Sequence, residues 1–374
     1  MKTHTFAILI IILFIHFTPL SIYASEDNFH IFRFNNNLNG YTDTSFSGKP
    51  QFKWRKQLPA IVSAAPVSDG KNILTSCSDN TVYCLKPEDG NINWQYKLPA
   101  ESQASITIFQ NSAIVCTTDN KVLSLAIDTG KLQWQKEIGG KVAGAANIFK
   151  DKNDIRILLG SYDHNVYCLN FANGDIHWQV AADNYINSSV SISGELAAVG
   201  SCDGFMYFID ITTGKISGKF DTGAYIPGWP IIDNDICYCG NYAGDFYAID
   251  VKTQKSLWNF KLEDGIIMKG PACGTANIVF ADEDGKLFCL DKVTGLVKWQ
   301  FKADDKVLTA PAINTDSVFC CSENGWVYIL DLADGKIKWK YLVGEDMTEP
   351  IYISGKTLLF TDNSGRVYCF AFAE

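Results

Sequence analysis

The sequence predicts an all-β fold, an eight-bladed β-propeller built from four-stranded antiparallel blades. A signal made of a turn and a tryptophan recurs about every 40 residues along the chain. Each repeat also contains four short β-rich segments, and the two ends of the chain supply the parts of one further unit. A fixed period near 40 residues, with short strands and no helical pattern, is typical of propellers with one blade per period.

The recurring signal is a turn rich in Asp, Thr and Gly that is followed by a tryptophan. Its clearest copy is Asp128-Thr-Gly-Lys-Leu-Gln-Trp134. The anchor position is occupied by Trp54, Trp94, Trp134, Trp178, Trp258, Trp299 and Trp339, and Gly218 stands where an eighth tryptophan is expected. A large flat ring can fill the gap between neighbouring blades while its N–H binds a carbonyl oxygen. We therefore interpret the seven tryptophans as structural residues that dock one blade on the next.

The elements of one repeat follow one another between residues 66 and 98. After a small-residue segment that ends at Pro66-Val67 come an apolar run at 72–75, a turn at 78–80, a β-rich run at 82–85, a turn at 87–90 and an alternating strand at 92–98. The turn residues Asp, Asn and Gly favour tight turns because their side chains bond the backbone or they adopt positive φ. We expect the small-residue segment just before the proline to form the innermost strand.

The N-terminal region divides into a signal peptide at 1–24 and a lead-in segment at 25–50. The apolar run from Phe6 to Phe17 has the length of a signal-peptide core and is too short for an ordinary membrane-spanning helix. The first cysteine is Cys77, so a lipid anchor on a modified cysteine is not supported. We expect a periplasmic or secreted protein, with a strand at His30–Phe34 and the propeller at 51–374.

The two ends of the propeller segment complement each other. The last repeat offers only three strands, at 351–353, 357–360 and 366–372, whereas residues 52–58 form a spare outer strand before the first repeat. Pairing of these parts removes two exposed sheet edges. The sequence therefore predicts that the N-terminal strand completes the last blade.

The charge and the cysteine pattern exclude some classes of function. A formal net charge of −9 argues against binding of a nucleic-acid backbone, which requires clustered Lys and Arg. Four of the twelve cysteines share one place in the third strand, where other repeats carry Ser, Phe, Ala or Ile: Cys84, Cys168, Cys289 and Cys369. This interchange favours buried free thiols. Disulfides remain possible in an exported protein, above all at Cys237 and Cys239 or at Cys320 and Cys321. The histidines do not stand at ligand spacing with any cysteine pair, so no metal site is expected.

The repeat resembles the pyrroloquinoline-quinone (PQQ)-like propeller family, including the BamB-like exported repeat proteins. The likeness lies in the turn-and-tryptophan motif, as at 128–134 and 291–299, and in Phe32-Arg33 followed by Gly40 in the lead-in. It covers residues 50–374. The resemblance implies a scaffold without enzymatic activity or, alternatively, a quinoprotein dehydrogenase that holds PQQ with Ca²⁺ over the central axis. In such enzymes a vicinal disulfide packs on the cofactor, and the neighbours Cys320 and Cys321 have that spacing.

The sequence favours an exported, monomeric, non-catalytic scaffold that binds a protein partner in the envelope or outside the cell. No cofactor is expected. The alternatives are a PQQ- and Ca²⁺-dependent oxidoreductase and a carbohydrate or polymer binding module. Any ligand site should lie in the axial funnel, where small residues dominate and five large or polar residues are exceptions: Gln103, Asn187, Trp229, Lys269 and Glu349. The competing interpretation is that Lys269 and Glu349 only pair with each other across a wet channel.

Overall fold

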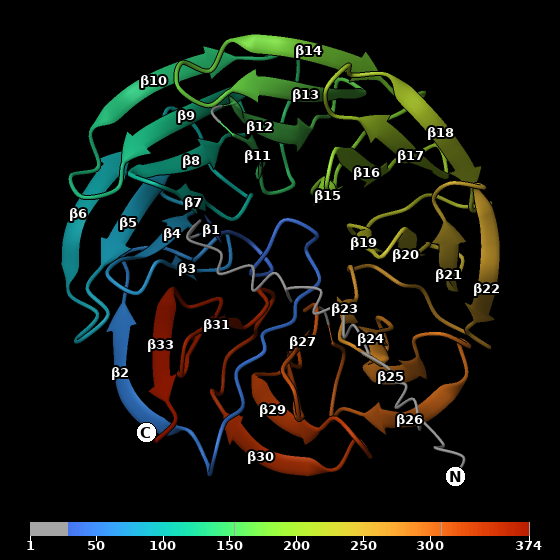
Figure 1. Cartoon of the computed structure of the whole chain (residues 1–374). Helices are drawn as coiled ribbons and strands as arrows, with labels where there is room; N and C mark the ends of the chain where they lie inside the picture. The colour runs from blue at the N-terminus through green and yellow to red at the C-terminus, as the bar shows by residue number, and fades with distance from the viewer. Residues whose placement is uncertain (1–28, 153, 308, 374) are drawn as a thin grey trace, which may run out of the picture.

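Eight antiparallel sheets form a ring around a central axis (Figure 1). The computed structural model describes residues 29–152, 154–307 and 309–373. The predicted signal peptide at 1–24 therefore lies outside the described residues. Within the described residues there are 33 strands and no helix, which confirms the predicted all-β class and the eight blades. Consequently, no helix in this part of the chain could cross a membrane.

Each blade has a short innermost strand and a longer second strand. The innermost strands are β3 (Val67–Ser68), β7 (Thr107–Phe109), β11 (Asn147–Asp151), β15 (Ser191–Ser193), β19 (Ile231–Asp233), β23 (Ala272–Cys273), β27 (Ala312–Ile313) and β31 (Tyr352–Ser354). The second strands are β4 (Ile73–Cys77), β8 (Ser112–Cys116), β12 (Asp154–Gly160), β16 (Leu196–Gly200), β20 (Ile236–Gly240), β24 (Asn277–Ala281), β28 (Ser317–Cys321) and β32 (Thr357–Thr361). We number the blades 1 to 8 in the order of these strands.

The third strands are buried, and the outer strands form the circumference of the ring. The third strands are β5 (Thr81–Leu85), β9 (Lys121–Ala126), β13 (Asn165–Asn170), β17 (Phe205–Asp210), β21 (Asp245–Asp250), β25 (Lys286–Asp291), β29 (Trp326–Asp331) and β33 (Arg366–Ala371). The outer strands are β6 (Ile92–Lys97), β10 (Leu132–Glu137), β14 (Ile176–Ala181), β18 (Ile216–Asp221), β22 (Lys255–Lys261), β26 (Val297–Lys302), β30 (Ile337–Leu342) and β2 (Gln51–Gln57). The core therefore lies between the blades, in the faces of the second and third strands.

The innermost strand begins later in each repeat than the sequence suggested. We expected it in the small-residue segment before each proline or its equivalent, but that segment is a loop. In the five blades that have the proline, the strand starts one or two residues after it. Proline has no N–H to give to a ladder and a fixed φ, so it suits the entry to a strand better than its end. The small-residue segments thus line the axis as loops.

The last blade is closed by the N-terminal strand, as predicted. Strand β2 pairs antiparallel with β33, with Gln51 opposite Ala371 and Gln57 opposite Arg366. Phe52 packs edge-on against Phe370 across this pair. Because the two ends of the propeller share one sheet, β33 is covered by β2 and the last blade has four strands.

The lead-in segment lies across the axis, where its backbone bonds to several blades (Figure 1). Its strand β1 (Phe29–His30) pairs with β7 and is shorter than the predicted strand at His30–Phe34. The chain turns at Arg33 and Phe34, both at positive φ, so the strand cannot continue. Further along, the backbone at residues 36–42 bonds to β11, β15, β23 and β27. The segment fills one end of the central channel.

The anchor tryptophans lie at the junctions between consecutive blades. In six of them the indole Nε1 donates to a carbonyl of the next blade at 2.7–3.3 Å: Trp54, Trp94, Trp134, Trp178, Trp258 and Trp299. Each of these rings also covers a glycine at positive φ in the turn before the next outer strand, where a Cβ would come within 2.7 Å of a ring atom. Glycine is needed there for both the backbone conformation and the close approach of the ring.

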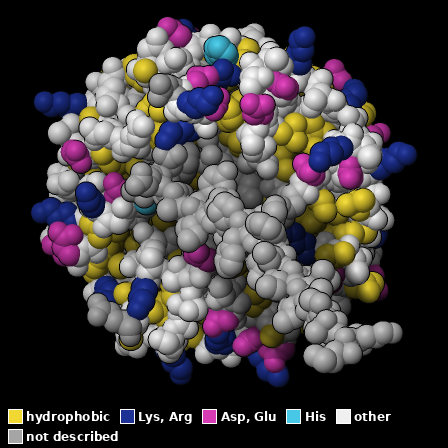
Figure 2. All heavy atoms as spheres, viewed as in Figure 1, with side chains coloured by type: hydrophobic (Ala, Val, Ile, Leu, Met, Phe, Trp, Pro, Cys, Tyr) yellow, Lys and Arg dark blue, Asp and Glu magenta, His cyan; other side chains and the backbone are white. Residues whose placement is uncertain are grey.

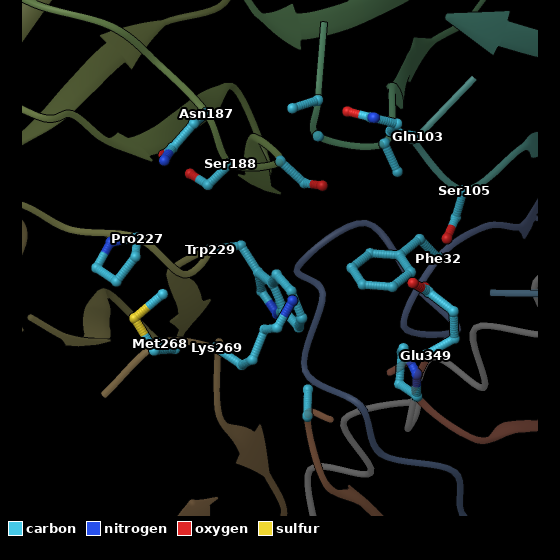
Figure 3. Close-up of a pocket in the computed structure, with 16 residues that line it drawn as sticks. Phe32, Gln103, Ser105, Asn187, Ser188, Pro227, Trp229, Met268, Lys269 and Glu349 are labelled. Atoms are coloured by element: carbon cyan, nitrogen blue, oxygen red, sulfur yellow. The ribbon is translucent and has the colours of Figure 1, made fainter. Parts of the chain in front are cut away.

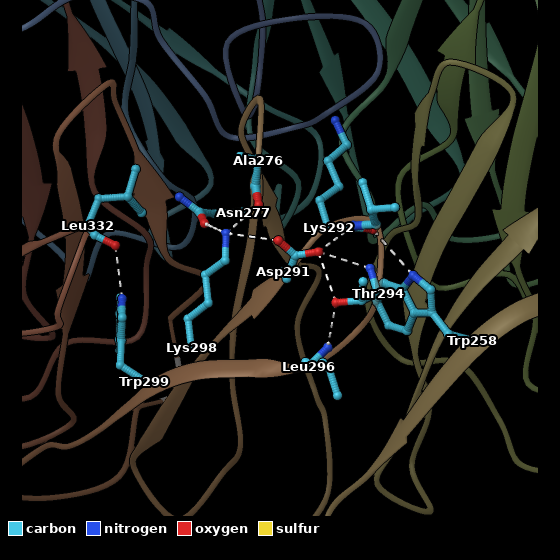
Figure 4. Close-up of polar contacts among 11 residues, drawn as sticks. Trp258, Ala276, Asn277, Asp291, Lys292, Thr294, Leu296, Lys298, Trp299 and Leu332 are labelled. Atoms are coloured by element: carbon cyan, nitrogen blue, oxygen red, sulfur yellow. Dashed lines mark hydrogen bonds and ion pairs between the residues drawn. The ribbon is translucent and has the colours of Figure 1, made fainter.

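One junction shows how the turn motif places these groups (Figure 4). The Asp291 carboxylate accepts from the Thr294 N–H at 3.0 Å and from the Thr294 hydroxyl at 2.9 Å, and Lys298 lies 3.1 Å from it. These bonds lower the pKa of Asp291 to about 2. The turn is thereby fixed in the shape that presents the Lys292 carbonyl to Trp258.

The junction without a tryptophan is filled by a different pair of side chains. Across the ladder from Gly218 stands Phe208, which is fully buried. In the next blade Gln254 replaces the usual glycine, keeps a φ of +56°, and donates from Nε2 to the Ser217 carbonyl at 3.2 Å. This junction therefore exchanges both partners of the usual contact: glycine replaces the tryptophan at 218, and glutamine replaces the glycine at 254.

This exchange can be tested by mutation. Gly218→Trp alone should destabilise the protein by about 1–3 kcal/mol, because its Cβ would lie 1.9 Å from Gln254 Nε2. Adding Gln254→Gly should recover most of that loss, since it restores the pair found at the other junctions. The melting temperatures of the two single variants and the double variant measure the coupling. Strictly additive effects would contradict the assignment.

The charged side chains are mixed in sign around the ring. On the face drawn in Figure 2, lysines and acidic residues alternate along the circumference, with apolar side chains between them. Several form ion pairs at the surface, such as Lys252 with Asp235 at 2.6 Å and Lys261 with Asp245 at 2.8 Å. Exposed pairs of this kind contribute little to stability. This face therefore presents no large region of one sign that would suit a nucleic acid.

Candidate binding site on the axis

A cavity of about 150 Å³ lies on the axis among the loops that enter the innermost strands, and Figure 3 shows residues that line it. The backbone of the lead-in segment bonds further along these strands, toward the other end of the axis. All five of the funnel residues singled out in the sequence line it: Gln103, Asn187, Trp229, Lys269 and Glu349. Sequence reasoning missed Phe32, Ser188 and Met268, which line it as well. Whether the cavity binds a ligand remains a prediction, but the structure does bring these residues together.

The loops before the innermost strands can be aligned by one equivalent position, and four residues at this position line the cavity: Gly144, Ser188, Lys269 and Glu349. The position three residues before the first paired residue of each innermost strand is occupied by Ala64, Ala104, Gly144, Ser188, Gly228, Lys269, Thr309 and Glu349. Six of the eight are small, because eight loops crowd around one axis. Lys269 in blade 6 and Glu349 in blade 8 are the two long, charged exceptions.

Several polar atoms of the wall have no hydrogen-bond partner among the described residues. They are the Asn187 Oδ1, the Ser188 Oγ and the Trp229 Nε1 atoms. Ser188 is 3% exposed and Trp229 is 8% exposed. Leaving a buried polar atom without a partner costs about 1–3 kcal/mol, so such atoms are uncommon and call for an explanation. A ligand that supplied hydrogen bonds to them would recover this cost.

The floor of the cavity is formed by an apolar cluster on the axis. Phe32 of the lead-in segment packs edge-on against Trp229, with ring centroids 4.7 Å apart. Leu38, Ala65, Ala145 and Ala310 complete the cluster. Below this contact the channel is filled by the chain itself, so the cavity has access to solvent at one end of the axis.

Arg33 fixes the lead-in segment beneath the cavity. Its side chain is 2% exposed and donates from Nη2 to the carbonyls of Pro271 and Pro311. The guanidinium carbon lies 5.6 Å from the centroid of the Trp229 ring. Burial lowers the pKa of Arg33 to about 9. The Phe-Arg-to-Gly spacing of the lead-in now has a physical reason, since a Cβ at Gly40 would lie 1.8 Å from Arg33 Nη2.

The two charged residues of the wall do not form an ion pair. Among the described residues, no ion pair within 4.0 Å joins Lys269 to Glu349, so the alternative of a simple pair across the channel is not what the structure contains. Burial raises the pKa of Glu349, while the charge of Lys269 and the backbone of Ala65 act in the opposite direction. The two charges thus influence each other across open space.

Two pairs of stacked tyrosines lie in, or pack against, the loops that also supply residues of the cavity wall. Tyr225 stacks on Tyr242 with centroids 4.5 Å apart, and Tyr162 stacks on Tyr185 at 5.5 Å. Tyr185 and Tyr242 are 47% and 42% exposed. Tyr185 and Tyr225 lie two residues before Asn187 and Pro227 of the cavity wall. We call these four tyrosines the aromatic rim.

The cysteines are packed inside the blades. All twelve are free thiols, and only Cys202 is partly exposed. The four that recur in the third strand each stand opposite an anchor tryptophan in the ladder, as Cys289 does with Trp299. Burial raises the pKa of Cys84, Cys168 and Cys289 to about 12. The predicted preference for buried thiols over disulfides agrees with this arrangement.

The number of reactive thiols should therefore differ strongly between the folded and the denatured protein. With a thiol-specific reagent at neutral pH, we expect at most one of the twelve cysteines, Cys202, to react in the folded protein. All twelve should react after denaturation without any reductant, because a thiolate is needed for reaction and burial disfavours it. Fewer than twelve thiols in denaturant would show that disulfides exist.

The residues present do not fit a PQQ and Ca²⁺ site. No three His, Cys, Asp or Glu side chains converge to hold a metal ion in the part of the chain that is described. The neighbours Cys320 and Cys321 lie in β28 and point into different core clusters on opposite faces of the blade, far from the position a cofactor-packing disulfide requires. The cavity is also smaller than the roughly 300–1,000 Å³ typical of pockets for larger organic ligands.

The comparisons with known proteins agree with the propeller fold. Residues 144–374 match the family model described as "Beta-alanine-activating enzyme, beta-propeller".

BamB from Moraxella catarrhalis is 18% identical, with a TM-score of 0.75 over 87% of this chain and 100% of its own. A europium-containing methanol dehydrogenase is 12% identical, with a TM-score of 0.78 over 92% of this chain and 98% of its own. Quinohemoprotein alcohol dehydrogenase from Comamonas testosteroni is 11% identical, with a TM-score of 0.75 over 92% and 80% of the two chains. No curated protein sequence matches this chain. At these identities the structural likeness shows a shared fold, and a fold by itself does not specify a function.

Proposed function

This chain belongs to the β-propeller family of the beta-alanine-activating enzyme, and from that premise we propose that it is a non-catalytic binding scaffold. The proposed partner is a protein of the cell envelope or the extracellular space, held on the aromatic rim around the axial cavity. The proposal includes export directed by residues 1–24 and a monomeric mature chain. The likeness to BamB supports a scaffold at the level of the fold.

The observation that carries the proposal is the difference between the two ends of the axis. The lead-in segment occupies one end, where its backbone groups form hydrogen bonds to the blades. The other end keeps unpartnered polar atoms and stacked, exposed tyrosines. Tyr and Trp are enriched at protein interfaces because they bury a large area at a small cost in conformational entropy. The open end therefore has the composition of a recognition surface.

A shallow hollow extends this surface on the side away from the tyrosines. It is bordered by Ile61, Glu101 and Thr348, and it shares Gln103 and Glu349 with the axial cavity. Ile61, which is 49% exposed, adds an apolar side chain to this hollow. A partner that covered the aromatic rim and the hollow would also cover the mouth of the cavity.

The test compares partner capture by matched surface variants. The variant Tyr185→Ser/Tyr242→Ser removes the exposed rings of the aromatic rim. The control Leu257→Ser removes a side chain that is 54% exposed on the outer strand β22. Each purified protein is incubated with the solubilised envelope fraction, and bound proteins are quantified by mass spectrometry. A partner retained by the wild type and the control but lost by the rim variant supports the proposal. Equal retention by all three proteins would refute it.

The quinone alternative makes a different prediction. If the chain were a quinoprotein dehydrogenase, adding PQQ and Ca²⁺ to the purified protein would produce alcohol- or glucose-dependent reduction of a dye. We expect no such reduction, because the cavity offers Glu349 as its one carboxylate and lacks the further acidic ligand that a calcium site needs. Dye reduction above that of heat-denatured protein would overturn the non-catalytic assignment.

A further inference from the structure

We propose that the axial cavity binds a small zwitterion, an amino acid in its free form, between Lys269 and Glu349. The inference goes beyond the proposed scaffold function, because it concerns a small molecule bound by the chain alone. It rests on the placement of two opposite charges, on the unpartnered polar atoms elsewhere in the cavity wall, and on the size of the cavity.

The two charges come from equivalent positions of blades 6 and 8. Between them stands the equivalent position of blade 7, where Thr309 turns its hydroxyl away to donate to the Cys321 carbonyl at 3.2 Å. The remaining equivalent residues are Ala, Gly or Ser. Lys269 and Glu349 are therefore the two groups that can supply opposite charges at this level of the axis, and an open space separates them.

The lack of an ion pair between them is the central observation. Lys269 is exposed and Glu349 is half-buried, so an ion pair between them would recover only part of the cost of removing Glu349 from water. Both side chains line the cavity instead, without a contact within 4.0 Å of each other. A ligand whose carboxylate binds Lys269 and whose ammonium binds Glu349 would give each side chain a partner of opposite charge.

The neutral polar groups of the wall suit the same ligand. The Ser188 hydroxyl and the Asn187 Oδ1 atom lack partners and can accept from an ammonium group, and the hydroxyl can donate to a carboxylate. In Figure 3 these two residues lie across the opening from Phe32 and Glu349. The groups that need hydrogen bonds thus surround the space from more than one side.

The rest of the lining sets the class of side chain that the ligand can carry. Phe32, Trp229 and Met268 provide an apolar surface, and methionine adapts well to irregular shapes. A cavity of about 150 Å³ holds a compact molecule and excludes a long peptide. The best ligand is therefore an amino acid with a small or medium apolar side chain.

The experiment separates the two charges of the ligand. Binding to the purified protein is measured by isothermal titration calorimetry with three compounds. L-Leucine carries both charges, N-acetyl-L-leucine carries only the negative charge, and L-leucinamide carries only the positive charge. L-Leucine should bind at least about tenfold more tightly than either derivative, which corresponds to about 1.4 kcal/mol. Equal affinity for all three compounds, or no binding of any common free amino acid, would overturn the inference.

Variants of the wall then assign each charge. Lys269→Met should weaken L-leucine about tenfold or more and leave L-leucinamide unchanged, whereas Glu349→Gln should weaken L-leucine and leave N-acetyl-L-leucine unchanged. Matched controls are Lys306→Met and Glu323→Gln, which change charges on the rim of blade 7 outside the cavity lining. Loss of leucine affinity in a control, or its retention in both wall variants, would refute the assignment.

The scaffold proposal and the amino-acid proposal can be refuted independently of each other. The calorimetry contains no partner protein, so a failure to bind leucine leaves the aromatic-rim result untouched. Conversely, a rim variant that loses its partner should still bind leucine, because Tyr185 and Tyr242 do not line the cavity.

Discussion

The variant Gly40→Ala should destabilise the protein by about 2–5 kcal/mol. Gly40 has a φ of +61°, which costs a residue with a Cβ about 1–2 kcal/mol. The new Cβ would also lie 1.8 Å from Arg33 Nη2, and overpacking of this kind costs about 1–3 kcal/mol. The guanidinium would have to leave the carbonyls of Pro271 and Pro311. Chemical denaturation followed by tryptophan fluorescence gives the change in the free energy of unfolding.

A second variant distinguishes the contact from the backbone strain. Arg33→Met removes the guanidinium and should relieve the steric part of the Gly40→Ala loss, so that the double variant is destabilised by less than the sum of the single variants. The control is Gly48→Ala, a glycine at φ +76° with no atom near its missing Cβ. A loss at Gly48 as large as that at Gly40 would show that conformation alone, and not the Arg33 contact, determines the effect.

The variant Trp299→Ala should have an effect of similar size, about 3–5 kcal/mol. The Trp299 ring is 8% exposed, its Nε1 donates to the Leu332 carbonyl at 2.9 Å, and it covers Gly335 of the next blade. Truncation leaves a cavity at a blade junction and a carbonyl without its donor. Gly335→Ala should also be costly, because its φ is +73° and its Cβ would lie 2.6 Å from the Trp299 ring.

The matched control for this loss is Trp326→Ala. Trp326 begins strand β29 and is partly exposed, with Lys340 over its ring at 4.3 Å and no indole hydrogen bond among the described residues. We expect it to cost less than half as much as Trp299→Ala, as measured by the shift in the midpoint of denaturation. Equal losses would mean that the anchor tryptophans contribute only ordinary hydrophobic burial.

The repeat could be predicted from the sequence because its signals are local. A turn motif fixes its own backbone, as the Asp291 and Thr294 side chains do, and an alternating strand requires only its neighbours in sequence. The pairing of β2 with β33 was also predictable, since a spare strand and an incomplete blade had to meet. The position of the innermost strands was predicted wrongly, because short, small-residue segments carry no alternation to distinguish a strand from a loop.

The candidate site could be predicted only in part. Large and polar exceptions in a small-residue context identified Gln103, Asn187, Trp229, Lys269 and Glu349, which the structure places around one cavity. The contribution of Phe32 could not be predicted, because it comes from a segment outside the repeat. Its position depends on the burial of Arg33 between blades 6 and 7.

The sequence by itself determined the number of blades, the closure of the ring and the residues at the blade junctions, because each follows from a periodic pattern or from the composition of a turn. Only the tertiary structure decided that the lead-in segment fills one end of the axis and that Lys269 and Glu349 stand apart at the other. Both facts depend on contacts between residues that are distant in the chain. Such contacts follow from the geometry of the closed ring, and local sequence patterns do not predict them.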